Sequence, residues 1–147
     1  MRVEIKKATI EDSDFLLSLR NEKSTKKNSF NTNKINKKNH KSWFKKELDN
    51  KETILLIAYK NFEKIGSVKY IFKDIFAYVS ISIEKNFRNL GYGSIVLKAA
   101  ELFLKKRTII VAKVKKGNKK SINIFKKNKF TFFSNKKYIT LIKILKK

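Results

Sequence analysis

Apolar and polar residues alternate with a period of two in several short segments, a spacing typical of strands that bury one face. Residues 2–8 and residues 76–83 show this alternation, and residues 53–59 form an almost continuously apolar run that predicts a buried strand. The remaining predicted strands are residues 65–72, 108–114, 130–133 and 138–145.

Helical spacing of apolar residues predicts four helices between these strands. Asp12 or Ser13 is a suitable cap for the first of them, because a side-chain oxygen there accepts from the free N–H groups of the first turn. Residues 21–33 are polar and lack apolar periodicity, so we expect a loop that holds about one helical turn. The predicted helices are residues 15–20, about 37–48, 95–105 and 119–128.

The predicted order of elements is β-α-α-β-β-β-α-β-α-β-β, which indicates a mixed α/β (α+β) fold. The chain has 147 residues and shows no repeat and no proline-rich linker, so residues 1–147 are predicted to form one domain. With 41% hydrophobic residues, it can bury a substantial core. No apolar run approaches the roughly 18 residues needed to span a bilayer, and we expect no membrane association.

The formal net charge of +25 raises nucleic-acid binding as a hypothesis, because basic proteins are attracted to phosphate backbones. The basic residues are nearly all lysines and are spread along the whole chain, which favours a solvated surface over a specific nucleic-acid site. The chain has no cysteine, which excludes disulfides and thiol catalysis. Together with the lack of a secretory signal pattern, this favours a cytoplasmic location.

The strongest candidate chemistry lies in residues 76–106. The predicted strand leads into a turn with two glycines at residues 88–94, and a helix follows. The first N–H groups of a helix lack partners, and this end of the helix is electropositive. Glycines allow the backbone to approach a ligand closely. We therefore predict a main-chain cradle for phosphate groups, with Arg88 as an added charge at its mouth.

The glycine spacing excludes two common nucleotide-binding motifs. The dinucleotide fingerprint requires three glycines, and the nucleoside-triphosphate loop ends in Gly-Lys followed by Ser or Thr. The pattern Arg88-x-x-Gly91-x-Gly93 instead resembles the pyrophosphate-binding motif of the GNAT superfamily of N-acetyltransferases, Gln/Arg-x-x-Gly-x-Gly/Ala. Two glycines at this spacing also occur in ordinary surface turns.

A second block, residues 112–130, supports the same resemblance independently. Asn118, Ser121 and Ile122 follow the pattern of strand, Asn, small residue and Ile that joins the fifth strand of the family to its fourth helix. The order of the predicted elements is also that of the family. The resemblance implies the GNAT fold, a single mixed, mostly antiparallel sheet of six to seven strands flanked by about four helices.

The resemblance further implies acetyl-CoA as the acetyl donor. Main-chain groups of the central strand would pair with the pantetheine arm like an added strand, and a backbone N–H there would polarise the thioester carbonyl. The amides of residues 89–94 would hold the pyrophosphate, and Asn118, which also suits a helix N-cap, would bind the pantetheine side. The implied cofactor-binding residues are Ile81, Ser82, Ile83, Arg88, Asn89, Leu90, Gly91, Tyr92, Gly93, Ser94, Asn118 and Phe125.

Two positions depart from the family pattern. Phe125 stands where the family often has a tyrosine that protonates the leaving thiolate, so that proton must come from water, from Tyr138 or from another group, or no specific acid is used. Lys129 stands where the family has a glycine before Phe130, which predicts a different turn, or strain if φ is positive there.

The first third of the chain points to a branch of the family. Arg20 and Asn21, then His40-x-x-Trp43-Phe44, resemble the acetyltransferases of nucleotide-linked amino sugars, such as the pseudaminic acid pathway enzyme. The same residues are also similar to the enzymes that acetylate the N-termini of ribosomal proteins. The resemblance to the first group implies a UDP-linked amino-deoxy-sugar as the acceptor.

The acceptor amine must lose a proton, and two side chains are candidates for the base. His40, the single histidine, titrates in the right range, although it is equally well explained as a packed residue on a helix face beside Trp43. Glu84 ends the central strand near the expected thioester; its simpler interpretation is a solvated carboxylate beside Lys85.

Four residues are candidates for acceptor binding. Trp43 and Phe44 have the character of an apolar wall for a sugar or uracil ring, or of plain core residues. Arg20 and Asn21 are candidates for contacts with a diphosphate, or simply end a helix with a cation.

We therefore predict a cytoplasmic N-acetyltransferase that transfers acetyl from acetyl-CoA directly to the primary amine of a small molecule. Direct transfer is expected because no cysteine can carry an acyl group. One alternative is an enzyme that acetylates protein N-termini; another is a basic nucleic-acid-binding domain with a degenerate acetyl-CoA site. No metal ligand set and no specific nucleic-acid contact are expected, and a homodimer is possible.

Overall fold

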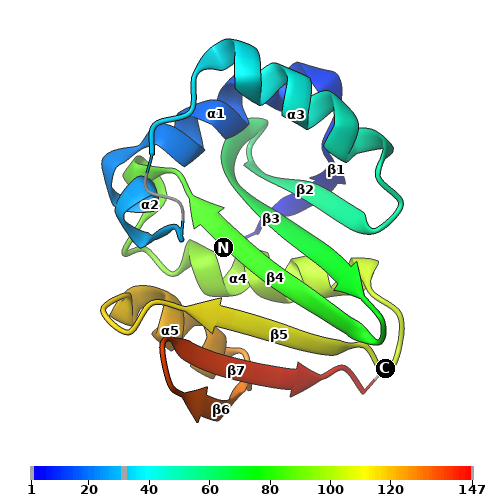
Figure 1. Ribbon diagram of the computed structural model, residues 1–147, viewed down its shortest axis with the longest axis vertical. Coiled ribbons are helices and arrows are strands. Elements are labelled where there is room, and N and C mark those ends of the chain that lie inside the picture. Colours follow the sequence, from blue (N-terminus) through cyan, green and yellow to red (C-terminus); the bar gives the residue numbers. More distant parts are fainter. Residues whose placement is uncertain (1, 31–32, 147) are drawn as a thin grey trace.

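The architecture is a single twisted sheet with helices on both faces (Figure 1). The computed structural model describes residues 2–30 and 33–146, and in these ranges seven strands pair with one another. The strands are β1 (Glu4–Lys7), β2 (Thr53–Lys60), β3 (Glu63–Lys73), β4 (Phe76–Ile83), β5 (Ile109–Val114), β6 (Thr131–Asn135) and β7 (Ile139–Ile144). Their order in the sheet is β1-β2-β3-β4-β5-β7-β6, and all neighbours are antiparallel except β4 and β5.

Five α-helices are present in the described ranges, together with short 3₁₀ turns such as those at Lys85–Phe87 and Glu101–Phe103. None of these helices has both the length and the apolar character needed to cross a membrane. The helices are α1 (Ser13–Asn21), α2 (Lys23–Asn28), α3 (Lys37–Asp49), α4 (Tyr92–Ala100) and α5 (Lys119–Lys127).

The two faces of the sheet carry separate cores, because successive side chains of a strand point to opposite faces. Ile57 of β2 packs with Leu16 and Phe44, which places α1 and α3 on one face. Its neighbour Leu56 packs with Val96 in the larger core beneath α4 and α5. Figure 1 shows α1 and α3 over the β1–β3 end of the sheet and α4 behind it.

The close approach of β3 and β4 depends on one glycine. Gly66 lies opposite Ile83, at the end of β4. A Cβ atom at Gly66 would lie 2.6 Å from the carbonyl oxygen of Ser82, a distance that backbone atoms cannot accommodate without moving. Gly66 therefore fixes the end of β4, from which the turn to α4 departs.

β4 and β5 pair only over their first residues. The parallel register joins Phe76–Tyr78 to Ile109–Val111 and then stops. β4 continues to Ile83 and β5 to Val114, so residues 79–83 and 112–114 have no partner across this gap. Figure 1 shows the two strands diverging towards α2 and α5.

The fold class and the order of elements predicted from the sequence are confirmed. The central strand has the predicted limits, 76–83. Helix α4 begins at Tyr92 rather than at residue 95, because Gly91 adopts a left-handed conformation with φ of 87° and serves as the N-cap. The same helix ends at Ala100, where a 3₁₀ turn replaces the predicted last turn.

Two other differences have local causes. Helix α2, which makes five helices where about four are expected, lies inside the predicted polar loop of residues 21–33; residues 31 and 32 of that loop lie outside the described residues. Lys129 has a φ of 67°, so it takes the left-handed conformation for which the family pattern uses glycine, and the anticipated strain is present.

Candidate functional site

A cleft of about 610 Å³ opens where β4 and β5 diverge. Its walls are residues 79–83 of β4, the turn before α4, and the first turns of α5. The cleft therefore brings together the two sequence blocks that carry the family resemblance. The predicted cofactor-binding residues that line it are Ile81, Ser82, Ile83, Arg88, Asn89, Gly91, Gly93, Ser94, Asn118 and Phe125.

Two of the predicted cofactor-binding residues, both in the turn before α4, do not line the cleft with their side chains. Leu90 points to solvent, with 55% of its surface exposed. Tyr92 is buried, and its ring packs edge-on against Phe87 at 5.8 Å between centroids. Their side chains serve the turn and the core, and only their main-chain groups remain as candidates for the cradle.

The free edge of β4 presents main-chain groups to the cleft. Hydrogen-bonding direction alternates along a strand. The N–H of Glu84 donates to Ile65 on the β3 side, whereas the carbonyl of Ile75 accepts from Ile109 on the β5 side. The odd-numbered residues 79, 81 and 83 therefore turn their main chain towards the cleft. The main chain of Ser82 points to β3 instead, so Ser82 reaches the cleft with its side chain and not as predicted.

The turn between β4 and α4 has the properties of an anion cradle. Asn89 and Gly91 are both left-handed, with φ of 62° and 87°, which turns the backbone sharply. No side chain at the N-cap position of α4 accepts from the N–H groups of the first turn. These amides lie beside the cleft wall formed by Gly91, Gly93 and Ser94. They can therefore donate to an anion there.

Helix α5 closes the opposite side of the cleft. Asn118 is its N-cap and accepts from the N–H of Ser121 at 3.3 Å. The structure therefore shows the helix-capping role that the sequence analysis gave for Asn118. Asn128 donates to Ser94 Oγ at 3.0 Å and ties α5 to α4. Phe125 is 3% exposed and packs edge-on against Phe130. Phe125 thus lends an apolar surface to the cleft and no proton donor.

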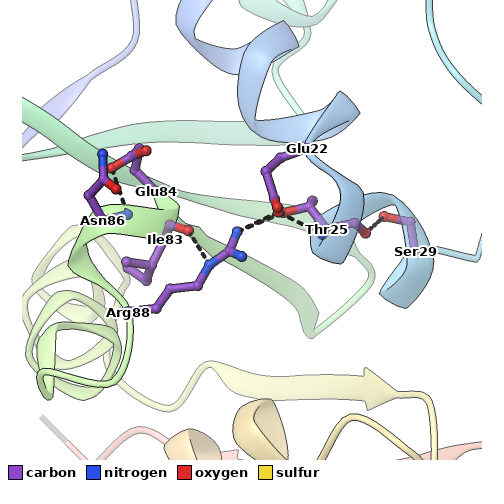
Figure 2. A network of polar contacts seen from close by, with 7 residues as sticks. All are labelled: Glu22, Thr25, Ser29, Ile83, Glu84, Asn86 and Arg88. Atoms are coloured by element: carbon purple, nitrogen blue, oxygen red, sulfur yellow. Dashed lines mark hydrogen bonds and ion pairs between the residues drawn. The ribbon is translucent and has the colours of Figure 1, made fainter.

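The guanidinium of Arg88 is engaged within the protein (Figure 2). Its Nε donates to the carbonyl of Ile83 at 2.8 Å, and Nη2 lies 2.8 Å from Glu22 Oε2 and 3.2 Å from Thr25 Oγ1. Arg88 lines the cleft as predicted, but its charge is paired with a carboxylate from the start of α2.

A second cavity of about 560 Å³ lies on the sheet face covered by α1 and α3. Its floor includes Ser67 and Lys69 of β3 and the side chains of Ser80 and Ser82 of β4. Ser80 and Ser82 also line the first cleft, as do Thr25 and Ser29. The two cavities therefore share a wall at the end of β4.

The second cavity is cationic. Arg20, Lys34 and Lys69 line it, and none of the described lining residues is an aspartate or a glutamate. Trp43 supplies an aromatic wall, and the Lys69 Nζ atom lies 5.2 Å from its ring centroid. The sequence analysis missed Lys69. The sequence did hold a signal for this position. Lys69 stands between Val68 and Tyr70, which are buried, and it pairs across the strands with the polar residue Ser80.

Two titratable groups of this cavity have lowered pKa values. Burial lowers the pKa of Lys69 below its ordinary value; Glu47 opposes this shift and Arg20 adds to it. Burial also lowers the pKa of His40, and Asp14 opposes the shift. His40 is 4% exposed, its ring stacks on Phe44, and its Nδ1 lies 3.4 Å from Ser13 Oγ. At pH 7 His40 is therefore neutral and can accept a proton.

Four other predicted site residues line neither cavity. The Glu84 carboxylate accepts from the N–H of Asn86 at 3.0 Å and caps the 3₁₀ turn (Figure 2). Asn21 exchanges two hydrogen bonds with the main chain of Ile35. Phe44 is fully buried in the core under α3. These three residues have structural roles, and for Phe44 this is the core position that the sequence analysis gave as the alternative.

Tyr138, the fourth, stands next to the first cleft. Its ring packs edge-on against Phe30 at 5.4 Å, and the Nζ atom of Lys113 lies 5.3 Å from its centroid. Phe30 and Lys113 both line the cleft. Tyr138 is thus one side chain removed from the cleft surface, and its role as a proton donor stays a prediction.

The sequence matches the model of the acetyltransferase (GNAT) family over residues 16–130. No match was found among curated proteins.

Solved acetyltransferase structures share the fold. The ribosomal L7/L12 α-N-protein acetyltransferase RimL, in complex with coenzyme A, is 15% identical, with a TM-score of 0.83 over 97% of this chain and 94% of that chain. An aminoglycoside acetyltransferase in complex with coenzyme A is 13% identical, with a TM-score of 0.80 over 97% and 95%. The putative acetyltransferase yncA from Salmonella typhimurium, with acetyl-CoA, is 14% identical, with a TM-score of 0.74 over 99% and 94%.

Replacing Gly91 with valine is expected to weaken coenzyme A binding by about tenfold or more, because losing even one hydrogen bond to a charged group has that effect. A β-branched residue is strongly disfavoured at φ of 87°, so the amides of the turn must move. Isothermal titration calorimetry measures the affinity, and circular dichroism verifies the fold. Gly117→Ala is the matched control, since no atom lies within 4 Å of the position that the added methyl group would take. An unchanged affinity in folded Gly91→Val contradicts the cradle.

The stability of the protein is expected to fall as the pH drops below about 6.5, in part because of His40. The unfolded chain takes up a proton on this residue near pH 6.5, whereas burial lowers the pKa of His40 in the folded state. His40→Gln should show a smaller loss of unfolding free energy between pH 7.5 and 5.5 in urea denaturation, pH values chosen around that ordinary pKa. The chain has one histidine, so its imidazole NMR signals give the folded-state pKa directly. A pKa at or above the ordinary value is the contrary result.

Proposed function

The chain belongs to the acetyltransferase (GNAT) family, and from this premise we propose that it transfers the acetyl group of acetyl-CoA to the primary amine of a UDP-linked amino-deoxy-sugar. Acetyl transfer is the activity of the family. The acceptor is inferred from the second cavity. Residues 1–147 are proposed to act as one catalytic domain, since one sheet carries both cavities.

The residues of the first cleft fit acetyl-CoA. When bound, acetyl-CoA supplies an acetyl group activated as a thioester. The amides between Asn89 and Ser94 are suited to its pyrophosphate, because they form a left-handed turn at the start of α4. The edge of β4 that does not pair with β5 is suited to the pantetheine amides, and we assign to the N–H of Ile81 the role of polarising the thioester carbonyl.

The observation that carries the choice of acceptor is the charge of the second cavity. An amine acceptor with a diphosphate would find three cations, Arg20, Lys34 and Lys69, and no lining carboxylate among the described residues. Trp43 offers a flat surface to a sugar or uracil ring. A polycationic aminoglycoside, the substrate class named for one structural neighbour, would be repelled.

Proton transfer is assigned to His40. It lines the second cavity, and its lowered pKa keeps it neutral at pH 7, so it can accept the proton of the acceptor ammonium directly or through water. The chain has no cysteine, and transfer is therefore direct, without an acyl-enzyme. With Phe125 in the cleft wall, the leaving thiolate takes its proton from water or from Tyr138.

The second candidate acceptor is a protein N-terminus. The structural likeness to RimL, with a TM-score of 0.83, favours it. The cationic cavity would then select an acidic N-terminal segment. A cytoplasmic location and a homodimer are also proposed.

The test is thiol release from acetyl-CoA with a UDP-linked 4-amino-4,6-dideoxy-sugar, and with an N-terminal peptide in parallel. The protein has no cysteine, so a thiol reagent reports only coenzyme A. We expect turnover with the sugar. Lys69→Met should raise the KM for the sugar about tenfold or more, since a charge-assisted contact is lost. Lys69→Arg should retain most of the affinity.

The control variant is Lys98→Met, an exposed lysine of α4 on the opposite face of the sheet. It removes the same charge at a distance from the cavity. Turnover with the peptide and not with the sugar would show that the enzyme acetylates protein N-termini. An equal effect of Lys69→Met and Lys98→Met shows that only the overall charge matters, which contradicts the cavity assignment.

A further inference from the structure

One arginine joins the two cavities. Arg88 belongs to the turn that leads into α4, and its side chain crosses the end of β4 to reach α2 (Figure 2). Its partners are the Ile83 carbonyl, Glu22 Oε2 and Thr25 Oγ1, at 2.8, 2.8 and 3.2 Å. We call these four residues the Arg88 clamp. Glu22 and Thr25 lie 66 and 63 residues away from Arg88 in the sequence, so the contacts of the clamp with α2 are tertiary.

Besides the clamp, Lys115 donates from Nζ to the carbonyl of Lys27 in helix α2, at 3.1 Å. The helix has no apolar residue of its own with which to pack. It has six residues, Lys23–Asn28, and none of its described side chains is buried. A helix this short is not stable alone and depends on tertiary contacts. Glu22 organises its first turn, because the same Oε2 atom that pairs with Arg88 accepts from the N–H of Thr25 at 3.1 Å.

The position of α2 matters because it borders both cavities. Thr25 and Ser29 line the cleft at the β4–β5 gap and also the cationic cavity. Ser29 Oγ donates to the carbonyl of Thr25 at 2.7 Å, which extends the network to the end of the helix (Figure 2). A displacement of α2 would therefore change the shared wall of the two sites.

The clamp is stronger than an ordinary surface ion pair. The side chains of Arg88 and Glu22 are 21% and 25% exposed, so water screens the pair only in part. Arg88 also donates from two different nitrogens to two elements at once, which fixes the plane of its guanidinium. By contrast, the paired side chains of Lys6 and Glu4 on β1 are 58% and 65% exposed.

We propose that Arg88 is a positioning residue that couples the cofactor cradle to the acceptor cavity by holding α2 through Glu22. The turn that receives the cofactor carries the side chain that places α2. Ordering the turn therefore orders the acceptor wall, and the effect is reciprocal. This proposal rests on the proposed function, in which the cleft takes acetyl-CoA and the cationic cavity takes the acceptor. In this proposal the guanidinium of Arg88 pairs with Glu22 at the start of α2 and does not bind the pyrophosphate.

The test compares Arg88→Gln, Glu22→Gln and the double variant by amide hydrogen exchange of residues 23–30, with and without coenzyme A. If the clamp holds α2, each single variant should exchange about tenfold faster or more in this segment, as expected for loss of a charged hydrogen bond. The double variant should resemble the single ones, because both remove the same pair. Coenzyme A should protect the segment in the wild type and much less in the variants.

Kinetics and two controls complete the test. Arg88→Gln and Glu22→Gln should both raise the acceptor KM more than they lower kcat, and Arg88→Lys should restore little, since lysine cannot make both contacts. Glu4→Gln removes an exposed ion pair and should change neither exchange of residues 23–30 nor KM.

Two results overturn the proposal. One is unchanged exchange of residues 23–30 in both variants. The other is a loss of coenzyme A affinity in Arg88→Gln alone, with Glu22→Gln like the wild type, which identifies Arg88 as a pyrophosphate contact. Hydrogen exchange and coenzyme A affinity are both measured without an acceptor, so these results remain valid if the sugar is not the acceptor. If coenzyme A does not bind at all, the proposed function fails, and exchange without ligand still decides the role of the clamp.

Discussion

The early end of pairing between β4 and β5 is the constraint on which the first cleft depends. Main-chain groups in a sheet normally find partners on the next strand, and an unpaired pair of strand edges in a protein interior is unfavourable unless a ligand or water satisfies it. Here the parallel register stops after Tyr78 and Val111. Gly66 holds β4 against β3 on its other side, so β4 cannot drift back across the gap. The gap is thus a lasting feature of the sheet, ready for a strand-like ligand.

Charge gives the second cavity its character. A protein with a net charge of +25 can place lysines almost anywhere on its surface. Lys69 is different, because it is half-buried on the cavity floor against Trp43 and its pKa is lowered by burial. An anionic acceptor would be attracted to this cavity, because its described lining residues include three cations and no carboxylate. His40, neutral for the same physical reason, lies in the same cavity.

The sequence predicted the sheet well, and it marked the two blocks that line the cleft between β4 and β5, because both depend on local signals. Alternation set the limits of β4, and the motif from Arg88 to Gly93 marked the turn. Helix α4 begins earlier than the sequence predicted, because the left-handed conformation of Gly91 allows the helix to start at Tyr92. At Lys129 the missing glycine of the family pattern left two alternatives, a different turn or a positive φ with strain, and the φ of 67° agrees with the second.

The proposed acceptor cavity was harder to predict, because its residues are set by tertiary contacts. Glu84 has the right place in the chain for a base, yet its carboxylate caps the next turn. Lys69 looks like a routine polar position of a strand until the fold puts it beside Trp43. Helix α2 has no apolar pattern, and the carboxylate that starts it pairs with an arginine 66 residues away.

The most direct test of this account is a crystal structure of the protein with coenzyme A. We expect the pantetheine arm between β4 and β5, hydrogen-bonded to the main chain of Ile81, and the pyrophosphate on the amides between Asn89 and Ser94. Arg88 should stay paired with Glu22. Coenzyme A bound elsewhere, or a gap between β4 and β5 closed by direct pairing of the strands, would contradict it.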